Sequence, residues 1–575
     1  MIGRLHRLRF WRDIQAPLAM YERRNGQSRS KSLSQRPVLQ HKWSGKQCSV
    51  LIGAFVTTTT LWLGYKPRDS QLKAHSREFI GSGYGTVHDY ENATSEIRKA
   101  LNEEAVSTAE ETRKAHGNTA RSSHETSQLP TAVVYPKTTE DVCTIARICQ
   151  KNKVPMVAYS GGSSTEGHCS LPYGGITINF TRMDRILDLH GDDMDVVVQP
   201  GVNWMDLNNK IKDSGLFFPI DPGPTAMIGG MVATNCSGTH AVRYGTMKDW
   251  VINLTVVLAD GTVIKTRRRP RKSSAGYNLT TLFVGSEGTL GMVTEATLKL
   301  AVIPQVTSVA VTTFPTIHDA AKAAIRIMRA GVPVGAMEIM DEVQMSIINR
   351  ACKKGHQWKE APTIFFKFTG THAGVKDDAN IVESLSRASK GRDFEFARTP
   401  EEAVALWSAR KEALWSMLRL LKDNQRFWGT DVAVPLSRLP DIIEVSKQDM
   451  DRLGLFASIL GHVGDGNFHA NIIYDDCSQE DRAKLEKSMQ DMIDRALGME
   501  GTCSGEHGVG LKKKAYLKQE LDVETINIMK RIKMALDPQW LMNPGKVFDQ
   551  HTIDTKEPKQ ESHTSKAENK TFQGS

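Results

Sequence analysis

The sequence predicts a two-lobed α+β protein with a membrane anchor at its N-terminus. Between residues 130 and 303, short apolar strands alternate with helical patterns and are interrupted by glycine-rich breaks. From residue 304 to 547, longer helical patterns and further strands predict a second α+β lobe with an antiparallel sheet. Ahead of both lobes lies a basic leader followed by an uncharged run. With 575 residues and 40% apolar side chains, the chain is long enough for about three or four folding units.

The net charge excludes one class of partner. Residues 1–49 contain eight Arg and three Lys against two acids, Asp13 and Glu22, so their excess of positive charge equals the +9 of the whole chain. The rest of the chain is therefore close to neutral. Because a surface that binds phosphate backbones keeps an excess of cations, we expect no nucleic-acid partner.

The eight cysteines are scattered and form no C-x-x-C pair. This spacing predicts neither a zinc ribbon nor a covalently attached c-type haem. In so long a chain we expect most of these thiols to be buried and unpaired.

Residues 1–47 have the composition of a mitochondrial presequence, because they are rich in Arg and Ser and nearly free of acids. Residues 48–65 are uncharged, and about 20 residues of helix cross a bilayer core, so we predict a transmembrane anchor there. Four threonines, at 57–60, keep a buried or surface helix open as the alternative. A presequence followed at once by such an anchor predicts a place in the mitochondrial inner membrane, with the two lobes facing the intermembrane space.

Residues 66–129 are polar and helix-biased, and they predict a linker with some helix. The first lobe, 130–303, opens with a strand and a helix whose start is marked by Thr138 and, three residues on, Asp141. Hydrophobic patterning predicts its elements, with helices at 138–153 and 203–214 and strands at 131–135, 154–159, 175–180, 195–199, 254–259 and 292–300.

In the second lobe, 304–547, the pattern predicts helices at 317–330 and 400–422, a strand near 363–369 and a loop at 461–469. The final segment, 548–575, is polar and low in aromatic residues. It is therefore expected to be disordered.

Four glycine-bearing segments fall within the first lobe, at 159–167, 199–201, 221–238 and 285–291. Glycine allows positive φ and close approach of the backbone, so its N–H groups can bind an anionic pyrophosphate. Each segment alone is typical of a turn. Four of them in order between predicted strands are harder to explain as turns and indicate a nucleotide site.

On these segments, residues 130–303 resemble flavoproteins with the vanillyl-alcohol-oxidase type of FAD domain (the PCMH type). The resemblance implies a bound FAD, an FAD-binding domain that is itself divided into two parts, and a substrate-binding cap domain in residues 304–547. Some relatives attach FAD covalently through a His beside paired glycines, and this chain has Ser163 at that place, so a non-covalent FAD is expected. The cofactor-binding residues that the resemblance implies are Ser160, Gly161, Gly162, Ser163, Ser164, Thr165, Pro222, Gly223, Gly229, Gly230, Ser237, Gly238, Glu287, Gly288, Val293 and Asn543.

The second lobe contains a candidate metal site. His462 and His469 flank a glycine-rich turn that can bring the two imidazoles together, and Glu506 can add a carboxylate oxygen. Two His and one carboxylate with open coordination positions are typical of a catalytic site for Zn²⁺ or Mn²⁺. The alternative is that each His only caps a loop.

Two further residues are candidates for catalysis. His507, next to Glu506, titrates near neutrality and can take a proton from a substrate hydroxyl. Arg410, on the predicted helix at 400–422, carries a guanidinium that suits a carboxylate, although a surface ion pair is an equally ordinary use of Arg.

Together, residues 130–547 resemble the branch of this flavoprotein family that contains D-lactate and D-2-hydroxyglutarate dehydrogenases. The resemblance implies that His462, His469 and Glu506 bind the metal, that His507 is the general base and that Arg410 holds the substrate carboxylate. It also implies oxidation of D-lactate to pyruvate by hydride transfer to FAD, and a return of the chain near Asn543 to the FAD domain. With the leader and anchor, the likeness is to fungal mitochondrial members that pass electrons to cytochrome c.

Three alternatives stay open. A D-2-hydroxyglutarate enzyme should offer a second cation to the distal carboxylate, but residues after Arg410 are mostly apolar, with Lys411 and Lys422 less certainly placed. A flavin-using transferase such as an ether-lipid synthase shares the glycine segments and has no need of the metal set. A tethered binding protein with a vestigial fold is the third. A quinone would also serve as the electron acceptor.

Overall fold

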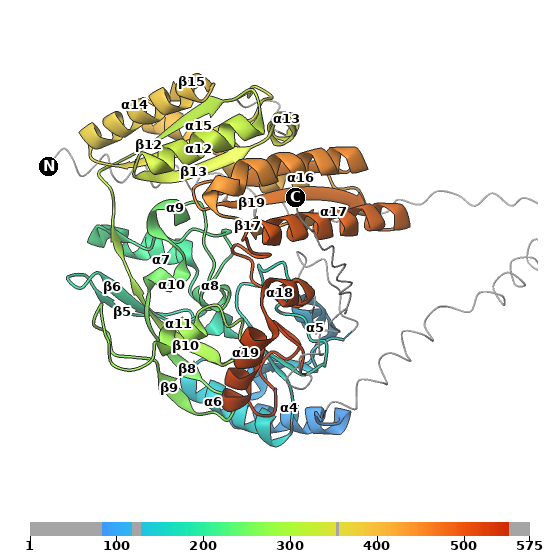
Figure 1. Ribbon diagram of the computed structural model, residues 1–575. Helices are drawn as coiled ribbons and strands as arrows, with labels where there is room; N and C mark the ends of the chain where they lie inside the picture. Colours follow the sequence, from blue (N-terminus) through green and yellow to red (C-terminus); the bar gives the residue numbers. More distant parts are fainter. Residues whose placement is uncertain (1–82, 118–127, 352–355, 551–575) are drawn as a thin grey trace, which may run out of the picture. The chain divides into compact units, whose positions relative to one another are not determined.

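The computed structural model describes residues 83–117, 128–351 and 356–550 (Figure 1). From Gly85 onward the described residues belong to one compact unit. The predicted presequence (1–47), the predicted anchor (48–65) and nearly all of the predicted disordered tail lie outside the described residues. Within the described ranges, no helix is both long enough and apolar enough to cross a membrane.

The first sheet lies at the start of the first lobe and has the strand order β1-β2-β4-β3. Its three longer strands run parallel, and α6 connects β2 to β3. Thr138 caps α6 in a reciprocal pair with Asp141, as predicted from the sequence. The elements are β1 (Val106–Ser107), β2 (Ala132–Val134), α6 (Thr139–Lys151), β3 (Met156–Tyr159) and β4 (Ile176–Asn179).

The segment predicted as a linker is part of this sheet along its described residues. It contains α4 (Val87–Leu101) and α5 (Glu110–Gly117), and β1 pairs antiparallel with β2. Ala93 and Ile97 of α4 are fully buried. The helical bias was predicted, whereas the pairing was missed because β1 is only two residues long.

The second sheet is antiparallel, with the order β5-β6-β10-β8-β9. The predicted strands at β6, β8 and β10 are present. The strands β5 and β9 were missed because their residues are largely exposed and show no apolar run. The elements are β5 (Ile186–His190), β6 (Asp195–Val198), β8 (Val251–Val257), β9 (Val263–Lys265) and β10 (Met292–Lys299), with α7 (Trp204–Ile211), α8 (Ile228–Thr234), α9 (Ala241–Tyr244), α10 (Met247–Trp250) and α11 (Leu279–Phe283); β7 (Leu216–Phe217) pairs separately with β11 (Ala301–Val302).

The second lobe is built on an eight-stranded sheet, in the order β15-β12-β14-β13-β18-β19-β16 with β17 beside β19. All of its pairs are antiparallel, as predicted. The strands are β12 (Val306–Thr313), β13 (Val334–Met340), β14 (Thr363–Gly370), β15 (Arg392–Phe396), β16 (Gln425–Gly429), β17 (Val432–Ala433), β18 (Phe456–Gly461) and β19 (Asn467–Asp475).

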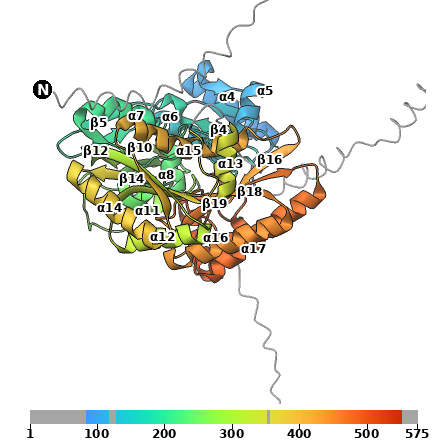
Figure 2. The ribbon, with the colours of Figure 1, turned by 90° about the horizontal axis from the view of Figure 1, so that it is seen from above.

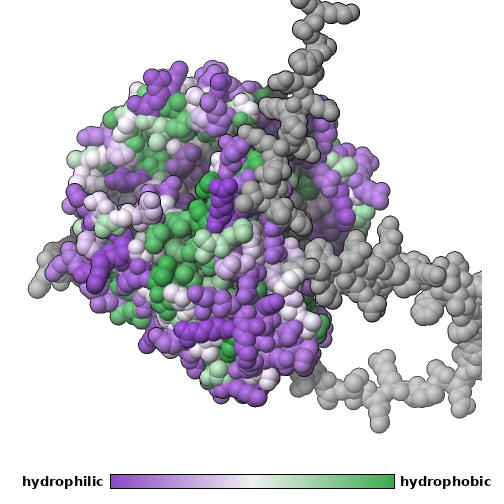
Figure 3. Space-filling view, turned by 60° about the horizontal axis from the view of Figure 1, so that its bottom comes forward, coloured by the Kyte–Doolittle hydropathy of each residue, from purple (hydrophilic) through white to green (hydrophobic). Residues whose placement is uncertain are grey.

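Helices cover both faces of this sheet (Figure 2). One core joins the sheet to α12 (Ile317–Arg329), α14 (His372–Ala388), α16 (Leu439–Leu453) and α17 (Gln479–Gly498). A second core, on the other face, joins it to α13 (Glu342–Ala351) and α15 (Pro400–Leu418). Seen as a surface, one face of the protein is mostly hydrophilic, with hydrophobic residues gathered near its middle (Figure 3).

The chain finally returns to the first lobe, as the resemblance implied. Helices α18 (Lys514–Glu520) and α19 (Val523–Leu536) follow the second lobe (Figure 1). Met542 then forms a parallel bridge with Met156 of β3. The buried Lys533 donates a hydrogen bond to the carbonyl oxygen of Thr289, 2.6 Å away. The second lobe is therefore an insertion that both of its ends connect to the first.

Candidate active site

The structure brings the three predicted metal ligands together. The segment predicted as one loop, 461–469, is the turn of the β18–β19 hairpin, and His469 lies on β19 itself, opposite Leu460. Oε1 of Glu506 lies 3.2 Å from Nε2 of His462 and 3.4 Å from Nε2 of His469. The three ligand atoms all lie within 4.8 Å of one another. One cation can therefore reach all three.

The side-chain atoms of these three residues that do not face one another make hydrogen bonds to neighbouring groups. Nδ1 of His462 lies 2.7 Å from Oε1 of Glu338, and Nδ1 of His469 lies 2.7 Å from the carbonyl oxygen of Thr430. Ser237 donates to Oε2 of Glu506 at 2.5 Å. A His that donates through Nδ1 has its lone pair at Nε2, which is the arrangement found in protein metal sites. This donor set fits Zn²⁺ or Mn²⁺.

Negative charge is concentrated around the two imidazoles. Burial opposes ionisation of Glu506, but His462 and His469 hold the pKa of this carboxyl well below its usual range. Burial likewise opposes the charged form of His462, but Glu338 and Glu506 raise the pKa of its imidazole. Two carboxylates, Glu338 and Glu506, therefore face the two imidazoles. Their two negative charges favour a divalent cation.

Glu338 was missed in the sequence. It lies on β13, its side chain is fully buried, and its second oxygen, Oε2, accepts from Nε of Arg410 at 2.8 Å. One carboxylate therefore orients both His462 and Arg410. The available signal was a single acid in the apolar strand Val334–Met340, because a buried carboxylate needs partners.

Substituting Glu338 by glutamine should weaken metal binding by about 10- to 100-fold, as loss of an outer partner of a ligating His does. The amide loses the charge that orients His462. We would measure the affinity for Zn²⁺ or Mn²⁺ by competition with a chelator. Glu395, exposed on β15 of the same sheet, offers the matched control Glu395→Gln. An unchanged affinity in Glu338→Gln would contradict this role.

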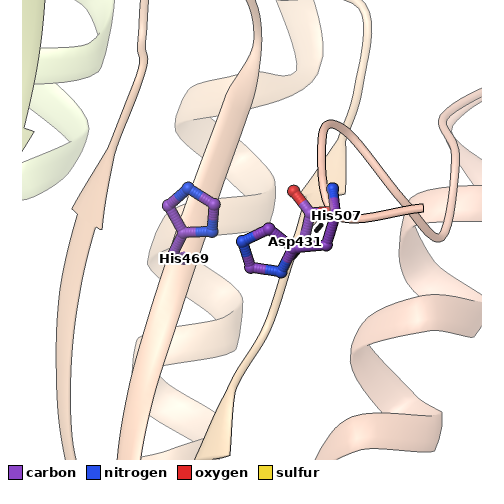
Figure 4. Close-up of side chains that lie close together, drawn as sticks. All are labelled: Asp431, His469 and His507. Carbon is purple, nitrogen blue, oxygen red and sulfur yellow. Dashed lines mark hydrogen bonds and ion pairs between the residues drawn. The ribbon is translucent and has the colours of Figure 1, made fainter. Parts of the chain in front are cut away.

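A second missed residue, Asp431, positions the loop that carries Glu506 and His507. It directly precedes β17, and its side chain is fully buried. The backbone N–H of Glu506 donates to Asp431 Oδ2 at 3.0 Å and that of His507 at 2.8 Å. Lys513 lies 3.2 Å from the same oxygen. Asp431, His469 and His507 also lie within ligand distance of one another (Figure 4), but these donors already occupy the Asp431 carboxylate.

His507 lies beside the metal ligands, with its ring stacked on that of His469 at a centroid distance of 5.2 Å. Its Nδ1 lies 3.3 Å from Oε1 of Glu166 and 3.9 Å from Oδ2 of Asp431. Burial opposes the charged form, but Asp431 and Glu166 raise the pKa of His507. With Nδ1 directed at these carboxylates, Nε2 is the atom that can accept a proton.

Arg410 is not engaged in a surface ion pair. Its partner, Glu338, is 1% exposed, and the Arg410 side chain itself is 17% exposed. Because Nε makes the contact with Glu338, the terminal N–H groups of the fork lie outside that ion pair. They suit a carboxylate.

All four glycine-bearing segments converge on α8. The N–H of Gly229 donates to the carbonyl oxygen of Pro200, and so does the hydroxyl of Ser160, at 3.0 Å. The N–H of Gly285 donates to Val232 and that of Glu287 to Ala233, both in α8. Segments up to about 130 residues apart in the sequence therefore surround one helix.

The glycine segments that surround α8 combine accessible glycines with closely packed ones. Gly230 and Gly288 (φ +70°) are both partly exposed, and a Cβ at either position would make only ordinary contacts, at 3.9 Å to Ser160 and 3.8 Å to Asn543. Gly161, in contrast, lies against the backbone of Thr225, because a Cβ there would be 2.5 Å from its carbonyl oxygen. The residues therefore fit a bound dinucleotide.

Several predicted cofactor residues make contacts within the protein. The Glu287 carboxylate accepts from the N–H groups of Val509 and Gly510, at 2.6 and 2.7 Å, and so holds the loop after His507. Asn543 donates to the carbonyl oxygen of Glu287, at 2.7 Å. Thr165 lies 3.5 Å from Nδ1 of His507. These residues connect the glycine segments to the loop that carries His507.

The remaining predicted cofactor residues are spread over the first lobe. Gly223 is exposed, and its carbonyl oxygen accepts from the indole of Trp204. Gly238 packs against Asp221, and Val293 lies on β10 against the core of the second sheet. The others keep partial exposure, namely Gly162, Ser163, Ser164 and Pro222.

Comparisons with known proteins agree with this architecture. Residues 130–267 match the family model "FAD binding domain", and residues 303–547 match "FAD linked oxidases, C-terminal domain". The chain is 47% identical to "D-lactate dehydrogenase [cytochrome], mitochondrial" of Arabidopsis thaliana, over 79% of each chain. It is 45% identical to the Kluyveromyces lactis protein of the same name, over 76% of this chain and 77% of that one. A solved structure of p-cresol methylhydroxylase has the same fold, with a TM-score of 0.67 and 17% identity over 81% of this chain and 98% of that chain.

Proposed function

The chain belongs to the FAD-linked oxidase family that includes the mitochondrial D-lactate dehydrogenases, and from that premise we propose that it oxidises D-lactate to pyruvate with FAD. The observation that carries the proposal is the gathering of His462, His469 and Glu506 beside His507. A 2-hydroxy acid needs its hydroxyl deprotonated and its C2 hydride removed. This set of residues supplies the first requirement, and a flavin supplies the second.

The roles of the residues follow from their contacts. His462, His469 and Glu506 would hold the metal, and the glycine segments around α8 would hold FAD. When bound, the metal lowers the pKa of the substrate hydroxyl and FAD accepts the hydride from C2. Arg410 holds the carboxylate through its terminal N–H groups, and His507 takes the hydroxyl proton at Nε2. Glu166 and Asp431 hold the His507 ring and stabilise the imidazolium that results.

FAD is bound non-covalently in this proposal. The position where some relatives have the attaching His is Ser163, which has no nucleophilic nitrogen. Acid denaturation should therefore release all of the yellow colour from the polypeptide. Flavin that stays with the precipitated chain would contradict this.

Cytochrome c is the proposed electron acceptor, and the word "cytochrome" in the names of the Arabidopsis and Kluyveromyces relatives supports an acceptor of this class. We place the protein in mitochondria, anchored in the inner membrane by residues 48–65, with the catalytic part in the intermembrane space. That location brings the enzyme to the compartment where cytochrome c is found. The basic leader and the uncharged run support this placement.

The test is anaerobic addition of D-lactate to the purified holoenzyme while the flavin spectrum is recorded. We expect rapid bleaching at about 450 nm with D-lactate, and a lower kcat/KM with D-2-hydroxyglutarate. A higher kcat/KM for D-2-hydroxyglutarate would favour the diacid function instead. Reduced enzyme mixed with cytochrome c or with a quinone then identifies the acceptor. No bleaching by either acid would overturn the proposal.

A further inference from the structure

A lysine lies on the active-site side of the second lobe. Lys367 is on β14, in the interior of the eight-stranded sheet, where its neighbours Phe366 and Phe368 are fully buried. Lys367 nevertheless keeps partial exposure. Its Nζ lies 2.9 Å from Nε2 of His240 and 4.3 Å from the centre of the Trp407 ring. The ammonium is thus surrounded by protein yet reaches solvent.

His240 is held so that it can accept a hydrogen bond from this ammonium. Its Nδ1 lies 3.1 Å from the carbonyl oxygen of Pro219, and its backbone N–H donates to Asp221 at 3.0 Å. Burial lowers the pKa of His240, against the opposing effect of Asp221, whose Oδ2 lies 3.4 Å from Nδ1, so the imidazole is neutral at pH 7 and above. A neutral ring that donates through Nδ1 has its lone pair at Nε2, facing Lys367. The imidazole therefore orients the ammonium without neutralising it.

The charge of Lys367 is left without a carboxylate in contact. Among the residues that the structure describes, no carboxylate oxygen forms an ion pair with its Nζ within 4.0 Å. Asp221 and Glu338 act on it from a longer distance, and so do the cations Lys411 and Arg410. Glu338 is already taken by Arg410 and His462. A largely enclosed cation with no carboxylate in direct contact favours binding of an anion.

Strand register places Lys367 on the same side as the catalytic residues. Lys367 is opposite Ala336 and Phe365 is opposite Glu338 in the β13–β14 pair. Because side chains alternate along a strand and paired residues share a side, Lys367 and Glu338 point to the same face of the sheet. This face is covered by α15, which carries Trp407 and Arg410.

We propose that Lys367 is a second cation of the substrate site and holds, together with Arg410, the carboxylate of the short 2-hydroxy acid. This inference rests on the proposed function. His240 is a positioning residue that directs the ammonium toward the carboxylate. Two cations on one carboxylate explain why a site for a small acid contains Lys367 as well as Arg410.

The ionisation of Lys367 makes the inference testable by pH. Burial, with Lys411 and Arg410, lowers the pKa of Lys367 to about 8, against the opposing effect of Asp221 and Glu338. His240 faces the same ammonium and is neutral. Only the protonated lysine binds an anion, so affinity for the substrate is present below this pKa and is lost as the pH rises through it. Arginine at this position stays charged.

The experiment compares wild type, Lys367→Met and Lys367→Arg as FAD-loaded holoenzymes. We expect Lys367→Met to raise the KM for D-lactate and the Kd of pyruvate for oxidised enzyme by about 10- to 100-fold, the usual effect of losing a hydrogen bond to a charged group. The kcat should change by less than about threefold, because the lysine acts on binding alone. Lys367→Arg should restore binding and keep KM constant between pH 7 and 9, while the KM of wild type rises. Lys376→Met, on the exposed face of α14, is the matched control.

The possible outcomes are separable. An unchanged KM and pyruvate Kd in Lys367→Met would overturn the inference, and so would a loss confined to D-2-hydroxyglutarate, which would place the lysine at the distal carboxylate. If wild type is not reduced by D-lactate, the proposed function fails, and pyruvate binding still reports on Lys367. If Lys367→Met does not fold, the pH dependence of Lys367→Arg against wild type decides: equal profiles overturn the inference.

Discussion

Replacing His507 by glutamine should slow reduction of the flavin by D-lactate by about 100- to 10,000-fold, the range for loss of a general base. Glutamine keeps a polar side chain of similar length but cannot take up a proton at neutral pH. Binding of FAD and of pyruvate should be retained, because Arg410 and the glycine segments are untouched. Stopped-flow absorbance under anaerobic conditions measures the rate of flavin reduction.

The matched control for this experiment is His372→Gln, since His372 is exposed on α14. It should reduce its flavin at the rate of wild type. A His507→Gln variant that reduces flavin as fast as wild type would remove His507 from the chemistry. The proton would then have to go to another group.

Loss of the metal should have the second large effect. Glu506→Gln removes the one negative charge among the three ligands, and we expect its bound metal to fall far below one ion per chain. The rate of flavin reduction should drop by at least about 100-fold, because a metal supplies several kcal/mol of charge stabilisation to such a reaction. Elemental analysis measures the bound metal, and stopped-flow absorbance measures the rate of flavin reduction.

Removing the metal with a chelator provides an independent test of its role. Wild type treated with a chelator should lose the same activity and recover it on addition of Zn²⁺ or Mn²⁺, whereas Glu506→Gln should not recover. Glu500→Gln, an exposed change six residues earlier, should behave as wild type. Full activity of the chelated, metal-free wild type would show that the three side chains do not serve catalysis through a metal.

The local elements of this protein could be predicted from its sequence. The Thr138–Asp141 pair that starts α6 and the apolar runs of β8 and β10 depend on residues a few positions apart. The glycine segments and the His462, His469 and Glu506 motif were also visible, because their residue types are uncommon together. Short or exposed strands such as β1 and β9 were not visible, since their pairing partners decide them.

Tertiary structure alone decided which groups surround these motifs. Glu338 meets His462 across 124 residues of sequence, and Lys367 meets His240 across 127. Neither contact leaves a local pattern, because a buried charge is stabilised by whichever partner the fold brings to it. The residue types that can carry out the chemistry can thus be identified from short sequence motifs. Their charge states and orientations come from distant segments, because electrostatic interactions depend on distance in space and on burial, and neither is a property of position along the chain.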